Sequence, residues 1–280
     1  MREPGFMAQI GQSTLQGMPI ATFVLNALAV HTNGADRQTL HRWIGILGKI
    51  FNKLHILQNI YLKNKYFLKR KSYSMDGEDI AIDQYIEKKN YGFYVDIGAH
   101  HPIQRNNTQL LFQKGWEGIN IDINNFSIDL FNFLRPNDLN ILTAVSDTEG
   151  EIIFYYQKDF SQLNTTNKQL AIQHFNGIFK EKSIKCNSIN NILNNSKYKE
   201  RQIDFLNIDV EGAEMKVLKH LNFKKYDPTL ICVEILGYGD LKPDDREIKV
   251  KEDNIYKLLI EKGYKKVWSG SSFCSHLFYK

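Results

Sequence analysis

The sequence predicts an α/β protein built on a mostly parallel sheet with crossover helices. From residue 91 onward, short apolar runs alternate with segments of helical spacing, which is the pattern of repeated strand and helix units. The chain has 280 residues, of which 42% are hydrophobic, so it can bury a large core. Its length favours one large domain with an arm, because two full domains would fit tightly.

The expected elements follow one another along the chain. Apolar runs predict strands at 93–97, 118–123, 140–146, 203–209 and 229–235, and helical spacing predicts helices at 108–114, 126–134, 189–194 and 213–220. The chain then ends with a predicted helix at 254–262 and runs at 264–268 and 272–279, which suggest a strand pair. Two stretches, 150–156 and 161–176, do not fit a helical crossover. We interpret them as an inserted hairpin and loop, which either forms a wall of a ligand site or decorates the edge of the sheet.

The charge is concentrated in an N-terminal arm. Residues 37–75 contain nine Lys and Arg and no acid, whereas the whole chain has a net charge of +5, so the body is mildly acidic. Six apolar residues in this arm recur at steps of four and three: Trp43, Leu47, Ile50, Leu54, Leu57 and Tyr61. This spacing predicts an amphipathic helix. The helix would dock on the body or on a second subunit, or lie on an anionic membrane surface. A nucleic-acid role is disfavoured, since no RNA-binding or helix-turn-helix signature is present.

Other features limit the class of protein. Cys186, Cys232 and Cys274 are far apart and form no CxxC pair, which argues against a disulfide framework and a cysteine zinc site and favours a reducing compartment. No stretch approaches the ~20 apolar residues that span a bilayer. We therefore expect a cytoplasmic protein, with the inner membrane surface as the alternative location for the arm.

The segment FYVDIGAHHP at 93–102 carries the most chemical information. Gly98 permits a tight turn after the strand, and Ala99 leaves room for a ligand to approach. A dinucleotide fingerprint would need two more glycines here, and His100, His101 and Pro102 take their place. This argues against a pyrophosphate ligand.

A nucleoside without phosphates fits the strand ends better. Asp122 ends the second predicted strand, where a carboxylate can accept hydrogen bonds from a ribose diol. Asp96 and Asp209 also lie at strand ends, where they would favour a sulfonium cation. S-adenosylmethionine is a nucleoside of this kind. Glu211 and Glu214 follow Asp209, and their simplest role is to favour the start of a helix.

Several ordered motifs together resemble the FkbM-type S-adenosylmethionine-dependent methyltransferases. They are MDGEDI at 75–80, GFYVDIGAHHP at 92–102, RNNT at 105–108, KGWEGINID at 114–122, AVSDTEGEI at 144–152 and IDFLNIDVEGAEMKVLKHL at 203–221. The resemblance covers residues 74–280. The leader and basic arm at 1–73 have no counterpart in it.

The resemblance implies a seven-stranded Rossmann-like methyltransferase sheet, mostly parallel with an antiparallel last strand. It also implies methyl transfer to a hydroxyl group of a sugar, a glycan or a secondary metabolite. By position, Asp96, Gly98 and Ala99 would form the cofactor loop and Asp122 would bind the ribose. Ser146 and Asp147 would neighbour the adenine, and Asp209 would face the sulfonium and the acceptor.

Methyl transfer to a hydroxyl is helped by a base that removes the proton. The candidates are Asp209, Glu234 at the end of the fifth strand, and His100 or His101. We assign no metal. The oxygen atoms of Asp209, Glu211 and Glu234 nevertheless suit magnesium or calcium, so a metal that holds the acceptor is an open alternative. A second class of function is a non-catalytic nucleoside-binding or scaffold protein that docks through its basic arm.

Overall fold

The computed structural model describes residues 37–86, 89–158, 160–235, 241–272 and 274–280. The chain separates into two compact units, residues 1–65 and residues 66–280. The first unit thus ends before position 73, where the arm was expected to end.

In the first unit, residues 37–63 are helical. Helix α3 spans Arg37–Leu57, and the π-helical turn η1 follows at Gln58–Lys63. The helix predicted from the apolar spacing is therefore present. In the described part of the chain, no helix combines the length and the hydropathy that crossing a bilayer requires.

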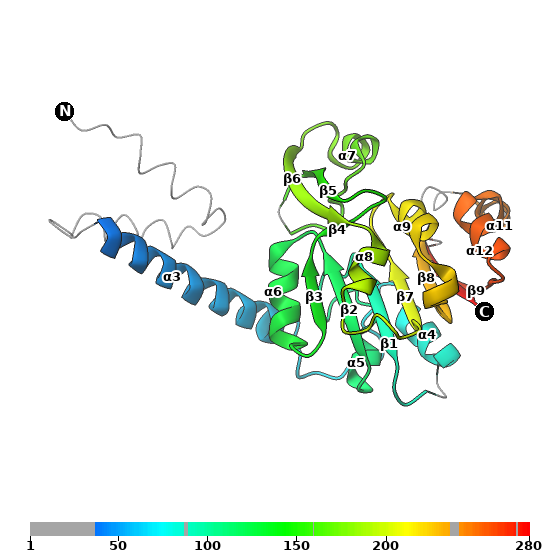
Figure 1. The fold of residues 1–280 in the computed structure, drawn as a ribbon, viewed down its shortest axis with the longest axis horizontal. Coiled ribbons are helices and arrows are strands. Elements are labelled where there is room, and N and C mark those ends of the chain that lie inside the picture. The colour runs from blue at the N-terminus through cyan, green and yellow to red at the C-terminus, as the bar shows by residue number, and fades with distance from the viewer. Residues whose placement is uncertain (1–36, 87–88, 159, 236–240, 273) are drawn as a thin grey trace. The chain divides into compact units, whose positions relative to one another are not determined.

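The second unit contains a seven-stranded sheet in the order β3-β2-β1-β7-β8-β10-β9 (Figure 1). Its strands are β1 (Phe93–Ile97), β2 (Glu117–Asp122), β3 (Leu139–Leu142), β7 (Phe205–Ile208), β8 (Leu230–Glu234), β9 (Lys265–Ser269) and β10 (Ser275–Tyr279). The first five are parallel to one another, and β10 runs antiparallel to both β8 and β9. The predicted seven-stranded sheet with an antiparallel last strand is confirmed.

Helices cover both faces of this sheet. They are α4 (Glu78–Ile86), α5 (Gln109–Gln113), α6 (Asn125–Leu134), α8 (Ile189–Asn194), α9 (Glu214–His220), α10 (Phe223–Tyr226), α11 (Pro243–Glu252) and α12 (Asn254–Glu261). Because side chains alternate along a strand, Val95 and Ile97 pack in a core with α8, α9 and α12. Tyr94 and Phe205 face the opposite core, with α4 and α5.

A smaller sheet is inserted into the crossover between β3 and β7. It has the order β4-β6-β5 and consists of β4 (Ala144–Val145), β5 (Gly150–Tyr156) and β6 (Lys180–Asn187), with helix α7 (Lys168–Phe175) between β5 and β6. The predicted third strand at 140–146 is divided, because the chain leaves the large sheet at Thr143 and pairs with β6 instead. The hairpin expected at 150–156 is formed with β6, which the sequence did not predict.

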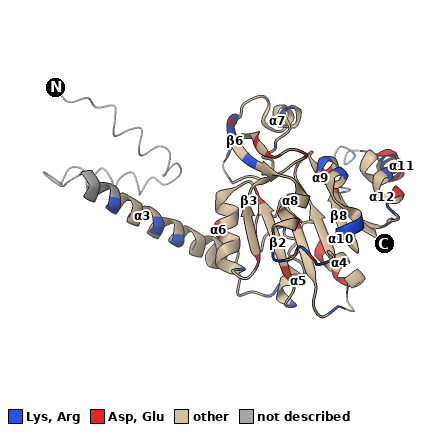
Figure 2. Cartoon of the chain, in the orientation of Figure 1, with Lys and Arg blue, Asp and Glu red and all other residues tan. Residues whose placement is uncertain are grey.

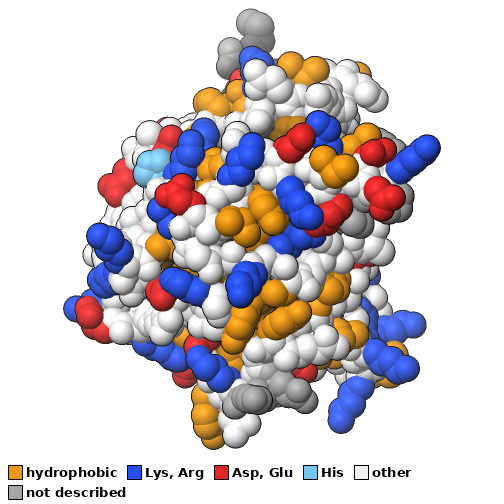
Figure 3. Space-filling view, turned by 90° about the vertical axis from the view of Figure 1, so that its right-hand side faces the viewer, with side chains coloured by type: hydrophobic (Ala, Val, Ile, Leu, Met, Phe, Trp, Pro, Cys, Tyr) orange, Lys and Arg blue, Asp and Glu red, His pale blue; other side chains and the backbone are white. Residues whose placement is uncertain are grey.

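Charge is distributed differently over the two units. Figure 2 shows basic and no acidic residues along the described part of α3, whereas both signs occur on the second unit. On the face of the second unit turned toward the viewer in Figure 3, acidic and basic side chains are interspersed, with small apolar patches between them. The three cysteines are free thiols, as the sequence predicts.

Candidate functional site

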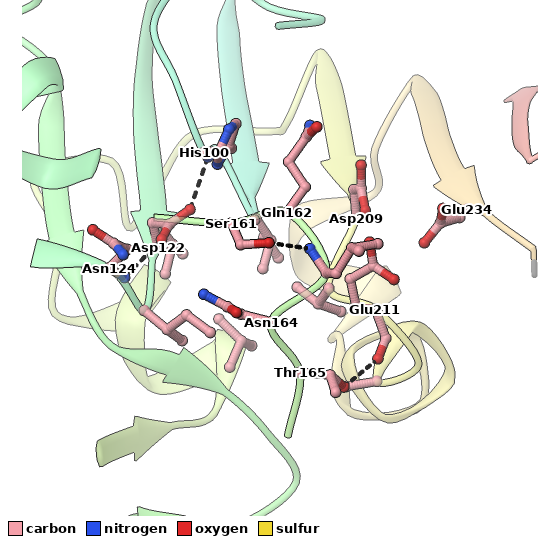
Figure 4. Close-up of a pocket in the computed structure, with 18 of the residues that line it drawn as sticks. His100, Asp122, Asn124, Ser161, Gln162, Asn164, Thr165, Asp209, Glu211 and Glu234 are labelled. Carbon is pink, nitrogen blue, oxygen red and sulfur yellow. Dashed lines mark hydrogen bonds between the residues drawn. The ribbon is translucent and has the colours of Figure 1, made fainter. Parts of the chain in front are cut away.

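A pocket opens where four parallel strands end (Figure 4). It is lined by Gly98 after β1, Asp122 at the end of β2, Asp209 after β7 and Glu234 at the end of β8. The carboxyl ends of adjacent parallel strands meet at one edge of a sheet, which is where open α/β sheets bind ligands. The sequence predicts that acidic residues gather at this edge, and Asp122, Asp209 and Glu234 do so.

Gly98 allows two strand ends to approach closely. Its φ is +82°, and a Cβ atom at this position would lie 1.7 Å from the carbonyl oxygen of Asp209. The amide N–H groups of Gly98 and Ala99 both donate to the carbonyl oxygen of Ile121, at 2.9 and 3.1 Å. A side chain at 98 would therefore force β1 and β7 apart. Ala99 itself is buried and is not among the residues that line the pocket.

Asp122 presents a fixed carboxylate to the pocket. One oxygen accepts a hydrogen bond from the backbone N–H of His100 (2.8 Å), and the other accepts one from the backbone N–H of Asn124 (2.7 Å). Burial raises the pKa of Asp122 to about 6, although these hydrogen bonds oppose the rise. The carboxylate is thus oriented and mostly ionised at neutral pH, and its remaining lone pairs can accept hydrogen bonds from a diol.

Asp209, Glu211 and Glu234 form an acidic cluster on the other side of the pocket in Figure 4. One oxygen from each carboxyl group lies within 4.8 Å of the others, close enough to share a divalent ion or to hold protons. Burial, with repulsion from Glu214 and Asp96, raises the pKa of Asp209 to about 7. Burial and the charge of Asp209 raise the pKa of Glu234 to about 11.

These shifts have a consequence for the protons of the cluster. Interacting carboxyl groups titrate together, so the cluster retains protons at neutral pH. The pKa of Asp209, about 7, lies below those of Glu211, about 8, and Glu234, about 11. Within the cluster, Asp209 is therefore the group closest to losing its proton near neutrality, whereas Glu234 stays protonated.

Glu214 has a structural role. Its carboxylate oxygens accept hydrogen bonds from the backbone N–H groups of Val210 (3.0 Å) and Gly212 (3.0 and 3.1 Å) at the start of α9. This is the favourable position for an acid at a helix N-terminus, and it agrees with the simplest interpretation from the sequence.

The loop of the insertion forms one wall of the pocket. Residues 160–166 line it, and the chain is brought there by two backbone hydrogen bonds between Tyr155 and Thr165. The ring of Phe160 stacks on His100 with a centroid distance of 4.5 Å and an interplanar angle of 14°. The Thr165 hydroxyl donates to the carbonyl oxygen of Glu211 at 2.7 Å (Figure 4). Of the two interpretations of this insertion, the structure supports the ligand-site wall.

A family model described as the methyltransferase FkbM domain matches residues 96–266, more than half of the chain. The chain belongs to the FkbM methyltransferase family. The match includes the turn at Gly98, Asp122, Asp209 and Glu234, which are the pocket residues described above. A comparison with curated proteins found no match. The family resemblance inferred from the sequence motifs is confirmed.

Asp96 does not reach the pocket of this methyltransferase. It is fully buried, and its carboxylate accepts hydrogen bonds from Asn207 (2.8 Å), Thr108 (3.0 Å) and Asn106 (3.4 Å). It lies one residue before the end of β1, so its side chain points to the opposite face of the sheet from Ile97. The structure thus differs from the predicted cofactor contact. Asp96 instead fixes β1 to β7 and to the loop that follows Gly98.

Ser146, Asp147 and His101 also lie away from the pocket lining. Strand β4 pairs with β6, and just after it the Ser146 hydroxyl donates to Asp147 at 2.9 Å. Thr143, Ala144 and Val145, which come just before them in the chain, do line the pocket. His101 is buried, and its Nδ1 accepts from two backbone N–H groups of the next turn. This makes His101 a structural histidine. His100 lines the pocket, but its ring is held against Phe160.

Several lining residues were not predicted. They include Met75, Glu78, Arg105, Asn107 and Phe160, whereas residues 161–166 belong to the stretch that the sequence offered as a wall of the site. Glu78 and Asn107 lie in MDGEDI and RNNT, two of the motifs that carry the family resemblance. Those motifs were the signal that could have pointed to the pocket. Both are polar, and in the structure Glu78 is buried against the pocket.

Proposed function

We propose that the chain transfers a methyl group from S-adenosylmethionine to a hydroxyl oxygen of a sugar, a glycan or a secondary metabolite. One observation carries the proposal. A fixed carboxylate, Asp122, and a proton-holding acidic cluster around Asp209 lie on two sides of the same pocket at the strand ends. The first suits a ribose, and the second suits a cationic methyl donor and an acceptor that must lose a proton.

The lining residues fit this cofactor. Asp122 would accept hydrogen bonds from the ribose hydroxyls, and Gly98 lines the same pocket. Ile123, Thr143 and Val145 would contact the adenine. Arg105 is the only Lys or Arg among the lining residues in the described part of the chain, so no cationic cradle for a pyrophosphate is built here.

The catalytic assignment follows from the positions of the acids. S-adenosylmethionine, when bound, supplies an electrophilic methyl group on a sulfonium, and transfer is an in-line displacement. Asp209 would take the proton of the acceptor hydroxyl as the oxygen attacks. Glu234 would remain protonated and hold Asp209 in place. The wall at 160–166 would help to exclude water from the reacting groups.

We expect Asp122→Ala to weaken the binding of S-adenosylhomocysteine by roughly 10- to 100-fold, because two charge-assisted hydrogen bonds to the ribose are lost. Isothermal titration calorimetry measures this directly. Asp147→Ala is the control, since Asp147 lies outside the pocket and is exposed, and it should bind as the wild type does. Equal affinities for Asp122→Ala and the wild type would refute the ribose assignment.

The pH dependence of turnover should report the base. Because burial and repulsion raise the pKa of Asp209 to about 7, only the deprotonated form above that pH can accept a proton. We expect kcat/KM to rise with pH through an inflection near neutrality and then level off. The measurement is initial rates between about pH 5 and 9. A flat profile across this range would argue against Asp209 as the base.

A non-catalytic nucleoside-binding protein is the second candidate. It is favoured by the loop at 160–166, which occupies the pocket wall between Asp122 and the acidic cluster and would block an acceptor if it did not move. A screen of hydroxylated sugars, glycans and metabolites with methyl-labelled S-adenosylmethionine separates the two functions. Incorporation of label into any hydroxyl supports the transferase. Tight cofactor binding with no labelled product in the whole panel supports the second candidate.

A further inference from the structure

We propose that helix α3 binds the surface of an anionic lipid bilayer. The proposal concerns the arm alone and is independent of the methyltransferase chemistry. It depends on three observations about α3: an exposed apolar face, a row of basic residues beside it, and the absence of acids from the arm.

The apolar face of α3 is exposed over several turns. Trp43 is 57% exposed, Ile46 39%, Ile50 48% and Leu54 54%. At about 100° per residue, these four fall within an arc of roughly 80°. Burying so many apolar side chains in water-free surroundings is favourable, whereas monomeric proteins rarely leave such a contiguous face uncovered. We therefore expect another molecule or surface to cover the apolar face of α3.

The charged residues of the helix indicate what covers it. Arg42, Lys49 and Lys53 are exposed and fall within roughly 40° of one another, next to the apolar arc. Long Lys and Arg side chains can extend from an apolar face to reach lipid phosphates. Aromatic and aliphatic residues on one side with Lys and Arg beside them are typical of helices that lie in the membrane interface.

The chain beyond the helix adds to the same charge. Residues 37–75 contain nine Lys and Arg and no Asp or Glu, and Figure 2 shows only basic charges on the described part of α3. Each Lys or Arg held near an anionic lipid surface strengthens binding, and the attraction decays within a Debye length.

A second copy of the helix is the main rival occupant. The spacing of Trp43, Leu47, Ile50, Leu54 and Leu57 would also suit a two-helix seam. Charges that flank such a seam normally pair with opposite charges on the partner. Here every flanking charge available in the arm is positive, so two copies would place like charges together. Charge therefore favours an anionic surface over self-association.

The test is partition of the full-length protein between buffer and vesicles. The vesicles are phosphatidylcholine alone or phosphatidylcholine mixed with phosphatidylglycerol, and binding is read by sedimentation. We expect binding to the anionic vesicles and little to the neutral ones. Salt at about 1 M, where the screening length is ~3 Å, should release the protein.

Matched variants locate the contact. Lys49→Gln with Lys53→Gln should weaken partition on the order of 30-fold, since two surface contacts are removed. Lys199→Gln with Lys257→Gln changes the net charge equally at exposed positions of the other unit and should leave partition unchanged. Trp43 is one of three tryptophans. In the wild type, brominated lipid in anionic vesicles should quench its fluorescence. Trp43→Phe should abolish this quenching, while the protein still binds the vesicles.

Four outcomes would overturn the proposal. They are no partition into anionic vesicles, equal partition into neutral vesicles, equal losses in the two double variants, and a lipid-independent dimer that Trp43→Ala with Leu54→Ala dissociates. The dimer would assign the face to a second copy of the chain. Circular dichroism of each variant checks that α3 is retained.

Discussion

Asp209→Asn should lower kcat by roughly 10²- to 10⁴-fold, the range lost when a positioned base is removed. Asn has nearly the same shape as Asp, so the strand end and the pocket should be preserved, but its amide cannot take the proton of an acceptor hydroxyl. Binding of S-adenosylhomocysteine should change only severalfold, because the ribose contact that we propose is made by Asp122 and not by Asp209. Initial rates and calorimetry on the same preparation separate the two effects.

The same strand offers a matched control. Asp204 precedes β7, and its carboxylate accepts from the backbone N–H of Phe93 at 2.8 Å and pairs with Lys89. It lies at the end of the strand away from the pocket. Asp204→Asn should cost some stability and leave turnover close to the wild type. Turnover of Asp209→Asn that matches the control would show that the base is another group. Activity that disappears with a chelator and returns with magnesium would assign the cluster to a metal.

Gly98→Ala should have the largest effect on folding. The Cβ atom of the new alanine would lie 1.7 Å from the carbonyl oxygen of Asp209. The alanine would also have to adopt the left-handed φ of +82°. Relief requires β1 and β7 to separate at the pocket edge. We expect a loss of more than about 4 kcal/mol in the free energy of unfolding, and loss of S-adenosylhomocysteine binding in whatever protein folds.

Gly115→Ala separates the clash from the backbone strain. Gly115 has nearly the same φ, +87°, but the space that its new methyl group would enter is open to a distance of 4 Å. The substitution should cost about 1 kcal/mol from the left-handed backbone alone. Urea denaturation of both variants gives the comparison. Similar losses would mean that the two strand ends can part easily.

The large sheet could be predicted because its central strands, β1, β7 and β8, are buried on both faces. Such strands appear in a sequence as short continuous apolar runs, and those at β1, β7 and β8 lie within two residues of their predicted bounds. Strand β6 gave no such signal. Its sequence, KEKSIKCN, is mostly polar, and most of its residues are exposed in a sheet with one open face. The division of the third strand at Thr143 was also hidden, because the apolar pattern continues through it.

The candidate site could be predicted only in part. Asp122, Asp209 and Glu234 were found because each lies at the end of a parallel strand, and such ends share one edge. Asp96 was expected in the pocket. Because side chains alternate along β1, Asp96 instead points to the face of the sheet opposite its neighbour Ile97. The stretch 161–176 was offered as a wall of the site, but Phe160 was missed, because only the pairing of Tyr155 with Thr165 determines which part of the loop lies against the pocket. No spacing of residues in the sequence predicts that the loop folds back against the pocket.

Calorimetry of the wild-type protein with S-adenosylhomocysteine and with NADH tests the central claim most directly. A nucleoside site at the strand ends, with a carboxylate for the ribose and no cationic pyrophosphate cradle, should bind S-adenosylhomocysteine with one site per chain and release no measurable heat with NADH. Binding of NADH, or no binding of S-adenosylhomocysteine by folded protein, would contradict the account.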